Sequence, residues 1–416
     1  MCYNYQVNKS QVNHNIRRYM KLRSIKTVKN LKGQKVFVRV DYNVDIEGEE
    51  VIENFRLKQS LATIKYLLKN DCQVIVGAHY GRPAGKVSKK YSMEPIVKEF
   101  RKLMKPIAVK FYPGKISLRL LDKLSEDNSK LIMLDNLRYN PSEKKNDPKF
   151  AEMLASMADI YVNEAFAVSH REAASIVGIT KYLPSYAGLN LIDEVSYLLK
   201  VAKPKKPAIA LIGGVKVASK FAVLNSFVKK YSKVVVGGGI ANTFLYSNGY
   251  KIGDSVMDKS FVTKVKRLNK KNIILPVDVV ITDTKTKTKK RYHKLSWGKE
   301  ICSSGEMIVD VGSETVKLIA NELLGKKTVV CSGVFGDTNV EEFKNGSKLM
   351  MRFVASQAKK RMVIGVLGGG SVIDLAFEMK KSNSFDFIST GGGAMLEFLE
   401  DKTLVGLEPL KKINNK

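Results

Sequence analysis

The sequence has few cysteines, no long apolar run and a shortage of acidic residues. Its four cysteines, Cys2, Cys72, Cys302 and Cys331, show no CxxC spacing. We therefore expect no disulfide framework and no zinc site, and the pattern is typical of a reducing compartment, the cytoplasm. No apolar run is long enough to span a bilayer, and the first residues lack the apolar segment of a secretory signal, so we expect no membrane contact.

The shortage of acid leaves a large positive charge. Lys and Arg number 71 against 40 Asp and Glu, which gives a formal net charge of +31. Such a charge attracts phosphorylated metabolites, nucleotides or nucleic acid. The lysines are spread along the chain, however, and this favours a lysine-rich proteome over a nucleic-acid surface. We predict that the densest run, 285–294 (KTKTKKRYHK), is a solvated loop or hairpin.

The length of 416 residues predicts two domains. Strand-like apolar runs alternate with helical patterns in both halves, which indicates an α/β fold with two Rossmann-like domains, each a mainly parallel sheet flanked by helices. The predicted strands are 35–40, 73–78, 107–111, 131–134, 159–162, 208–213, 233–238, 273–280, 307–312, 328–333, 362–369 and 386–390, and a helix is predicted at 56–70.

An amphipathic stretch that ends in KPKKP separates the two halves, and we interpret it as an interdomain helix and linker. The first residues are basic and without periodicity, which favours a disordered or mis-assigned extension. The predicted domains are an extension at 1–19, an N-terminal domain at 20–188, the helix and linker at 189–207, and a C-terminal domain at 208–401.

Basic and polar residues follow the predicted strands of the first half. Ligands bind beyond the carboxyl ends of the strands in open α/β sheets. One such arginine is more often a surface ion pair, but a group of them suits a small, multiply anionic substrate, because guanidinium groups match carboxylate and phosphate. The group consists of Asp41, Asn43, Arg56, His79, Arg82, Arg138, His170 and Arg171.

Glycines take the same positions in the second half. Glycine lets the backbone approach phosphate closely, and free N–H groups at helix starts bind anions. The sequence lacks the GxxxxGK[ST] pattern, so this is not a P-loop. Lys216 and Lys220 lie four apart, on one face if that segment is helical. Four glycine-rich turns in one domain indicate a nucleotide site, namely GGVKVASK, GGGIANTF, GGGS and STGGGA.

Nine short motifs occur along the chain in an order that chance would not produce. RVDYNV, HYGRP, DNLRY, VNEAFAVSHR, GGVKVASK, GGGIANTF, LPVDVV, STGGGAMLEFLE and GLEPL follow one another along the chain. In this order they closely resemble the phosphoglycerate kinase family, from about residue 31 to 410, and look closest to its archaeal branch. The resemblance implies reversible phosphoryl transfer between 1,3-bisphosphoglycerate with ADP and 3-phosphoglycerate with ATP, with Mg²⁺ carried by the nucleotide and no separate protein metal site.

The resemblance also implies roles for individual residues. The substrate would be held by Asp41, Asn43, Arg56, His79, Arg82, Arg138 and Arg171. The nucleotide would be held by Lys216, Lys220, Gly237, Gly238, Asn339, Gly368, Gly369, Gly370 and Ser371. The catalytic groups would be Arg56, Lys216, Gly370 and Gly393, and residues 402–416 would pack on the first domain. A monomer or homodimer is expected.

The nucleotide half departs from the family pattern. Ser371 stands where most members have the Asp that helps to hold Mg²⁺, Ser332 replaces an Asn, and Asn339 replaces the Glu that contacts the ribose. Two hypotheses follow. The first is an active kinase with an altered nucleotide pocket; the alternative is a catalytically weak homologue that binds anions or nucleic acid through its charge.

Overall fold

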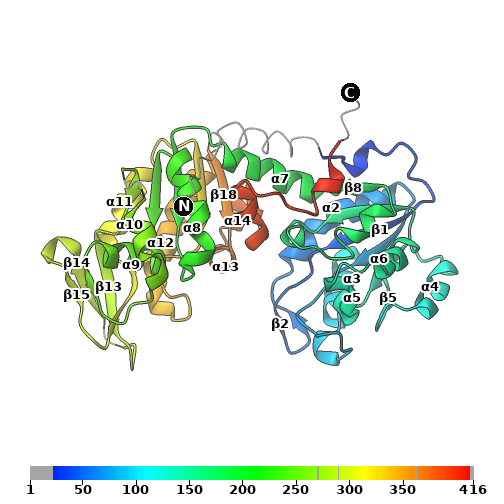
Figure 1. Ribbon diagram of the computed structural model, residues 1–416, viewed down its shortest axis with the longest axis horizontal. Coiled ribbons are helices and arrows are strands. Elements are labelled where there is room, and N and C mark those ends of the chain that lie inside the picture. Colours follow the sequence, from blue (N-terminus) through cyan, green and yellow to red (C-terminus); the bar gives the residue numbers. More distant parts are fainter. Residues whose placement is uncertain (1–21, 269–270, 289, 361–362, 413–416) are drawn as a thin grey trace, which may run out of the picture. The chain divides into compact units, whose positions relative to one another are not determined.

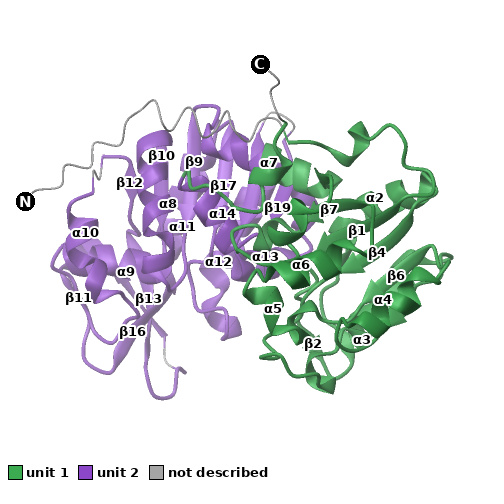
Figure 2. Cartoon of the chain, turned by 45° about the vertical axis from the view of Figure 1, so that its right-hand side comes forward, with its two compact units in different colours: residues 1–196, 401–416 green, residues 197–400 purple. Residues whose placement is uncertain are grey.

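The computed structural model describes residues 22–268, 271–288, 290–360 and 363–412. The predicted extension at 1–19 lies outside these residues. The chain divides into two compact units (Figure 2). Unit 1 consists of residues 1–196 and 401–416, and unit 2 of residues 197–400.

Unit 1 is built on a six-stranded sheet in the described part of the chain, in the order β5-β6-β4-β1-β7-β8. Every neighbouring pair is parallel. Helices cover the sheet (Figure 1). The strands are β1 Lys35–Val40, β4 Gln73–Gly77, β5 Lys110–Tyr112, β6 Leu131–Leu134, β7 Ile160–Glu164 and β8 Ser185–Ala187, with a small hairpin of β2 Ile46–Glu47 and β3 Glu50–Val51.

The helices of unit 1 bury their apolar residues against the two sheet faces. In α3, Ile96, Phe100 and Met104 are fully buried at a spacing of four residues, as expected for one face of a helix. The helices are α2 Phe55–Lys69, α3 Glu94–Met104, α4 Leu118–Ser125, α5 Pro141–Lys144, α6 Pro148–Ala155 and α7 Leu189–Ala202. Helix α7 continues into unit 2.

Alternation along β1 decides which residues reach which face of the sheet. Val36, Val38 and Val40 belong to one buried cluster, and Phe37 belongs to the cluster on the other face. Arg39 therefore shares the face of Phe37, although its strand is buried from Val36 to Val40.

Unit 2 also has a six-stranded parallel sheet, within the residues the structure describes, in the order β12-β10-β9-β17-β18-β19. Its strands are β9 Ala208–Ile212, β10 Lys233–Val236, β12 Ile273–Ile274, β17 Thr328–Ser332, β18 Ile364–Gly368 and β19 Phe387–Ser389. Its helices are α8 Val217–Lys230, α9 Gly238–Ser247, α10 Val262–Lys266, α11 Ser313–Leu323, α12 Asn345–Ala358, α13 Gly370–Glu378 and α14 Gly393–Leu399.

The predicted strand at 273–280 is wrong. The segment contains two strands that belong to different sheets. Strand β12 ends at Ile274, and β13 spans Asp278–Asp283. Strand β13 pairs antiparallel with β14, Lys290–Lys294, and with β16, Glu306–Val311. The run predicted at 307–312 is β16 and thus lies outside the parallel sheet. The lysine-rich run forms the exposed strand β14 of a hairpin, as predicted. A short pair, β11 Lys251–Ile252 and β15 Glu300–Cys302, completes the strands.

Candidate active site

The parallel strands of unit 1 bring the predicted basic residues to one edge of the sheet. Asp41 follows β1, His79 follows β4, Arg138 lies in the 3-10 turn η3 Leu137–Tyr139 after β6, and Arg171 follows β7. Arg56 is the second residue of α2. Since carboxyl ends of parallel strands share an edge, residues far apart in sequence meet here.

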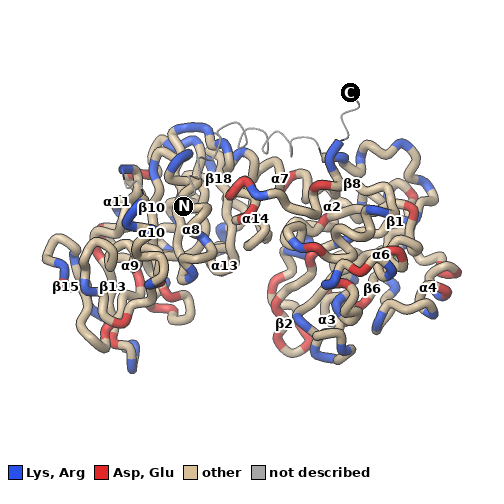
Figure 3. The backbone as a smooth tube through the Cα atoms, in the orientation of Figure 1, with Lys and Arg blue, Asp and Glu red and all other residues tan. Residues whose placement is uncertain are grey.

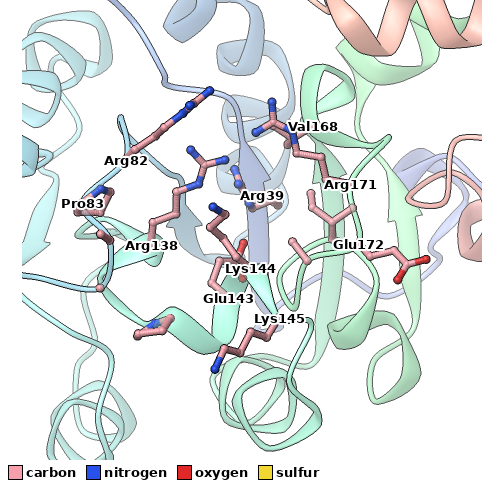
Figure 4. A pocket seen from close by; sticks show the side chains of 15 residues that line it. Arg39, Arg82, Pro83, Arg138, Glu143, Lys144, Lys145, Val168, Arg171 and Glu172 are labelled. Atoms are coloured by element: carbon pink, nitrogen blue, oxygen red, sulfur yellow. The ribbon is translucent and has the colours of Figure 1, made fainter.

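A pocket of about 800 Å³ opens at this edge (Figure 4). Arg82, Arg138, Arg39 and Arg171 line it, and their guanidinium ends turn toward one another in the view, whereas Lys145 points away. The pocket is also lined by Pro83, Ala84, Gly85, Pro141, Glu143, Lys144, Val168, Glu172, Ala173 and Ile176.

Arg39 lines the pocket but is not among the site residues predicted from the sequence motifs. Its side chain is 2% exposed, and its Nε donates to Ser175 Oγ at 2.8 Å. Ser175 Oγ in turn donates to Glu143 Oε1 at 2.6 Å. The signal was in the sequence: a charged residue inside the buried strand KVFVRV needs buried polar partners, since an unpaired buried charge is very costly.

Arg39 also fixes the state of His79. Its Nη2 lies 3.1 Å from His79 Nδ1, and because a guanidinium only donates, Nδ1 must accept and the ring proton must lie on Nε2. Burial, and then the charges of Arg39 and Arg138, hold the pKa of His79 well below its usual value. His79 is therefore a neutral N–H donor in a positively charged site.

The guanidinium groups repel one another. Burial, followed by the nearby charges of Arg171 and Arg39, lowers the pKa of Arg138 to about 10. Arg138 Nη1 donates to Gly81 O at 2.7 Å, which holds the arginine at the pocket. A site with so much unneutralised positive charge is suited to an anion with several negative groups.

Asp41 and Arg56 form an ion pair with each other. Asn43 Oδ1 accepts from Gly81 N at 2.8 Å, and this bond connects the segment after β1 to the segment after β4. The carboxylate of Asp41 thus orients Arg56 without lining the arginine pocket.

The predicted glycines of unit 2 fall into two groups. A methyl group on Gly213, Gly237 or Gly368 would meet Val334 O at 2.1 Å, the Phe335 ring at 2.2 Å or Met395 Sδ at 2.2 Å, respectively. At these positions tight packing requires a glycine, whether or not a phosphate binds nearby.

Gly369 and Gly370 are open. A methyl group on Gly370 would have Asp374 Oδ2 at 4.0 Å as its nearest neighbour, and one on Gly369 would have Ser332 Oγ at 3.8 Å and Gly333 N at 3.9 Å. We call this place the glycine corner and define it by Ser332, Gly333, Gly369 and Gly370. Gly370 is the first residue of α13, so N–H groups of a helix start belong to the corner.

Lys216 and Lys220 were expected on one face only if the segment is helical, and the helix begins one residue after Lys216. Lys216 precedes α8 as its N-cap residue and is exposed, whereas Lys220 lies inside the helix. Lys220 Nζ donates to Gly213 O and, at 3.1 Å, to Ser332 O, beside the glycine corner. Burial lowers the pKa of Lys220 to about 8.

The remaining predicted residues lie at loop and helix ends. Asn339 is exposed, and its Nδ2 donates to Asp337 Oδ1 at 3.0 Å. Ser371 and Gly393 are exposed in the first turns of α13 and α14.

No helix among the described residues is long and apolar enough to cross a membrane.

Each unit has a parallel sheet flanked by helices. One unit has an arginine-lined pocket at its strand ends, and the other has glycine turns at its helix starts. This combination is typical of an α/β transferase that acts on phosphorylated anions. The family model "Phosphoglycerate kinase" matches residues 25–402. The chain belongs to the phosphoglycerate kinase family.

Relatives of this name cover nearly the whole chain. The chain is 35% identical to the Borrelia garinii protein over 405 residues, which are 94% of this chain and 100% of the relative, and 36% identical to that of Geotalea uraniireducens over 409 residues, 95% and 100%. The solved structure from Coxiella burnetii has a TM-score of 0.79 at 30% identity, and that from Pyrococcus horikoshii 0.82 at 27%; each comparison covers 94% of this chain and 98% of the other.

Family membership confirms the predicted fold class and reaction. The chain is a phosphotransferase with a carboxyl group as acceptor, its substrates are phosphoglycerate and ADP or ATP, and the reaction is a step of glycolysis. The weak-homologue alternative is not favoured. The resemblance to the archaeal branch stays a prediction.

Proposed function

We propose that the arginine pocket of unit 1 holds 3-phosphoglycerate and that the glycine corner of unit 2 holds nucleotide phosphates. The observation that carries the proposal is the convergence of Arg39, Arg82, Arg138 and Arg171 on one pocket (Figure 4). A neutral His79 lies 3.1 Å from Arg39. Two acids, Glu143 and Glu172, also line the pocket, but Glu143 is occupied by Ser175. An anion with a phosphate and a carboxylate balances the excess charge.

The individual roles are those that the family's motifs imply for the matching residues of this chain. Arg56, oriented by Asp41, stabilises the reacting carboxylate; Asn43, His79, Arg82, Arg138 and Arg171 bind the substrate, and Arg39 positions His79. Lys216, exposed at the start of α8, neutralises the phosphoryl group in transfer. Gly370 and Gly393 supply N–H groups at helix starts; Lys220, Gly237, Gly238, Asn339, Gly368, Gly369 and Ser371 form the nucleotide site.

The reaction then needs no general base. The attacking group, a carboxylate or a diphosphate oxygen, is already ionised at neutral pH, so the protein's task is to align the groups and to stabilise charge on the transferred phosphoryl oxygens. Cations and backbone N–H groups do this without accepting a proton.

Mg²⁺ fits as a companion of the nucleotide. Among the described residues, no three His, Cys, Asp or Glu side chains gather into a set that could hold a metal ion. Nucleotide phosphates would therefore supply most of its ligands, and Mg²⁺ would offset their charge.

The domain assignment, the compartment and the partners are also proposals. We propose a substrate domain at 20–188 with 402–416, a linker at 189–207 and a nucleotide domain at 208–401, in a cytoplasmic monomer or homodimer. Lys and Arg are scattered over both units (Figure 3), which supports small anions rather than nucleic acid as partners.

The roles are tested by acyl-phosphate formation from 3-phosphoglycerate and MgATP, coupled to NADH oxidation. Arg56→Ala should lower turnover by about a hundredfold or more, since it removes a donor to the reacting group. Arg119→Ala is the matched control, because Arg119 is an exposed arginine of α4 outside the pocket. Equal activity in both variants would refute the role of Arg56.

A further inference from the structure

The segment between β17 and α12, residues 333–344, begins in the glycine corner and carries Asn339. We call it the 333–344 loop. It consists of bends, turns and the 3-10 helix η8, Glu341–Phe343. Asn339 bonds within the loop, because its backbone N and its Nδ2 both donate to Asp337 Oδ1 at 3.0 Å. The position of Asn339 therefore depends on what holds the loop to the rest of unit 2.

The carboxylate of Asp310, on β16, is inserted between this loop and the start of α12. The residue is 2% exposed, its Oδ2 accepts from Gly346 N at 2.6 Å, and its Oδ1 accepts from Val311 N at 2.9 Å. Oδ1 lies 2.5 Å from the position of a Cβ on Gly336 and 2.7 Å from that on Gly346. Both glycines thus leave the room that the carboxylate fills.

Ser347 fastens the loop from the side of α12. The residue is fully buried, and its Oγ accepts from Phe335 N and from Gly336 N, each at 3.0 Å. Asp310 and Ser347 therefore hold the first half of the loop between a strand and a helix.

A third bond connects this anchored part to Asn339. Asp337 N donates to Val309 O at 2.8 Å, and Val309 is the neighbour of Asp310 on β16. The strand that carries Asp310 thus holds Asp337, which in turn orients Asn339.

A carboxylate is a costly group with which to hold a loop. Burial raises the pKa of Asp310 to about 7, because removal from water disfavours the charged form. A serine or an asparagine would satisfy the amides at the start of α12 without this cost. The carboxylate offers two charged acceptor oxygens, whose hydrogen bonds are shorter and stronger than those of a neutral group, and it fixes the loop more tightly.

We propose that Asp310 is a positioning residue for the kinase reaction, which holds Asn339 at the nucleotide through the 333–344 loop. This inference rests on the proposed nucleotide site of unit 2.

The simpler interpretation of Asp310 is an acid that stabilises the start of α12. In that case Asp310→Asn lowers the melting temperature and leaves the kinetics of the folded enzyme unchanged. A positioning residue also changes the KM for MgATP. The KM for 3-phosphoglycerate stays the same, because the loop belongs to unit 2 and the arginine pocket to unit 1.

Asp278, on the neighbouring strand β13, offers a matched control. It is 4% exposed, and its carboxylate accepts from Glu314 N at 3.1 Å and from Thr315 N at 2.7 Å, in the first turn of α11. Asp278→Asn removes the same kind of bond at the start of α11 instead of α12. It should lower the melting temperature without changing the KM for MgATP.

The test is the coupled assay with the full chain, well below its melting temperature, in which MgATP and 3-phosphoglycerate are varied in turn. Asp310→Asn should raise the KM for MgATP by about tenfold or more and leave the KM for 3-phosphoglycerate unchanged. Asn339→Ala should also raise the KM for MgATP. The double variant should be no worse than Asn339→Ala alone, because Asp310 acts through Asn339.

Ser347→Ala keeps the inference testable if Asp310→Asn does not fold. It loosens the same loop more mildly and should shift the KM for MgATP in the same direction; a wild-type KM would count against the inference.

Two other results would overturn the inference while the nucleotide site stands. One is additive losses in the double variant, and the other is an Asp310→Asn enzyme with the same KM for MgATP as Asp278→Asn. If Asn339→Ala leaves the KM for MgATP unchanged, Asn339 is not at the nucleotide, and the inference fails together with that part of the proposed function.

Discussion

His79 illustrates how the neighbours of a single side chain set its chemistry. A histidine at a strand end would be expected to help bind an anion by carrying a charge, yet the ring is buried 3.1 Å from Arg39 Nη2 and its pKa is held well below the usual value. The ring is therefore neutral, with its proton on Nε2, throughout the neutral range of pH.

This state predicts a pH dependence of stability. The unfolded chain takes up a proton on His79 near pH 6.5, whereas the folded chain does so only at lower pH, so stability falls as the pH drops below about 6.5, by at most about 1.4 kcal/mol per unit. His79→Gln lacks this loss. The melting temperatures of wild type and His79→Gln, measured from pH 5 to 7.5, should diverge at neutral pH and converge in acid; parallel curves would contradict the assignment.

The two groups of glycines give a second prediction at this scale. Gly237→Ala places a methyl group against the Phe335 ring and should cost about 1–3 kcal/mol of stability. Gly370→Ala meets nothing nearer than 4.0 Å and should stabilise α13 by about 0.5–1 kcal/mol, while nucleotide affinity falls. Melting curves with and without ADP separate the two effects; similar losses of stability would refute the distinction.

The sequence identified most of the candidate site residues but not their states. Motif order placed the arginines, because strand ends in a parallel sheet meet at one edge. Arg39 was not predicted as a site residue, because its role depends on contacts with Ser175 and Glu143. These two residues lie more than a hundred positions away in the sequence. The contact of Lys220 with two carbonyl oxygens likewise depends on how β9, β17 and α8 pack, which no local pattern reveals.

The start of α7 shows the same dependence at the scale of elements. Glu164, the last residue of β7, accepts from Asn190 N at 3.0 Å and Leu191 N at 2.9 Å. Thr63 of α2 donates to Glu164 and accepts from Leu189 N at 2.8 Å. A buried carboxylate and a hydroxyl thus satisfy the first amides of the helix and join three elements.

Thr63→Val should therefore destabilise the protein by about 1–3 kcal/mol, because it leaves the amide of Leu189 and one bond of Glu164 unsatisfied at nearly constant volume. Thr63→Ser keeps the hydroxyl and is the matched control. Hydrogen exchange of the Leu189 and Leu191 amides should accelerate in the valine variant alone. Unchanged protection would show that the hydroxyl does not hold the helix.

Strands were predictable where apolar runs were long and buried on both faces. The runs at 35–40 and 131–134 coincide with β1 and β6. The run at 273–280 was predicted wrongly as one strand. Strand β12 has only two residues, and the antiparallel strand β13 begins after a break that contains a proline, so a single apolar run spans strands of two different sheets. Strand β8 has three residues and forms through its pairing with β7. Its own sequence is too short to predict a strand.

Across the whole molecule the charge of +31 opposes compaction. Salt screens this repulsion, so the melting temperature should rise between low salt and about 0.2 M NaCl. Sodium sulfate at equal ionic strength should raise it further, because sulfate also fills the arginine pocket. Arg138→Ala should reduce the additional gain with sulfate and keep the gain with NaCl; an equal gain in both proteins would mean that sulfate does not bind there.

The end of the chain belongs to unit 1. Leu404, Leu407 and Leu410 are fully buried, Gly406 N donates to Ser169 O at 2.8 Å, and Asn163 Nδ2 donates to Gly406 O at 3.2 Å. Ser169 lies two residues before Arg171, so the last segment supports the loop that carries a pocket arginine.

This return of the chain sets an order for biosynthesis. Unit 2 is one continuous segment, residues 197–400, so all of it is translated before residues 401–416. Unit 1, although its first 196 residues are translated earliest, cannot complete its packing until residues 401–416 are also available. A nascent chain therefore completes the support of the loop that carries Arg171 only after Gly406 has left the ribosome, and a stop codon before Leu404 would remove that support.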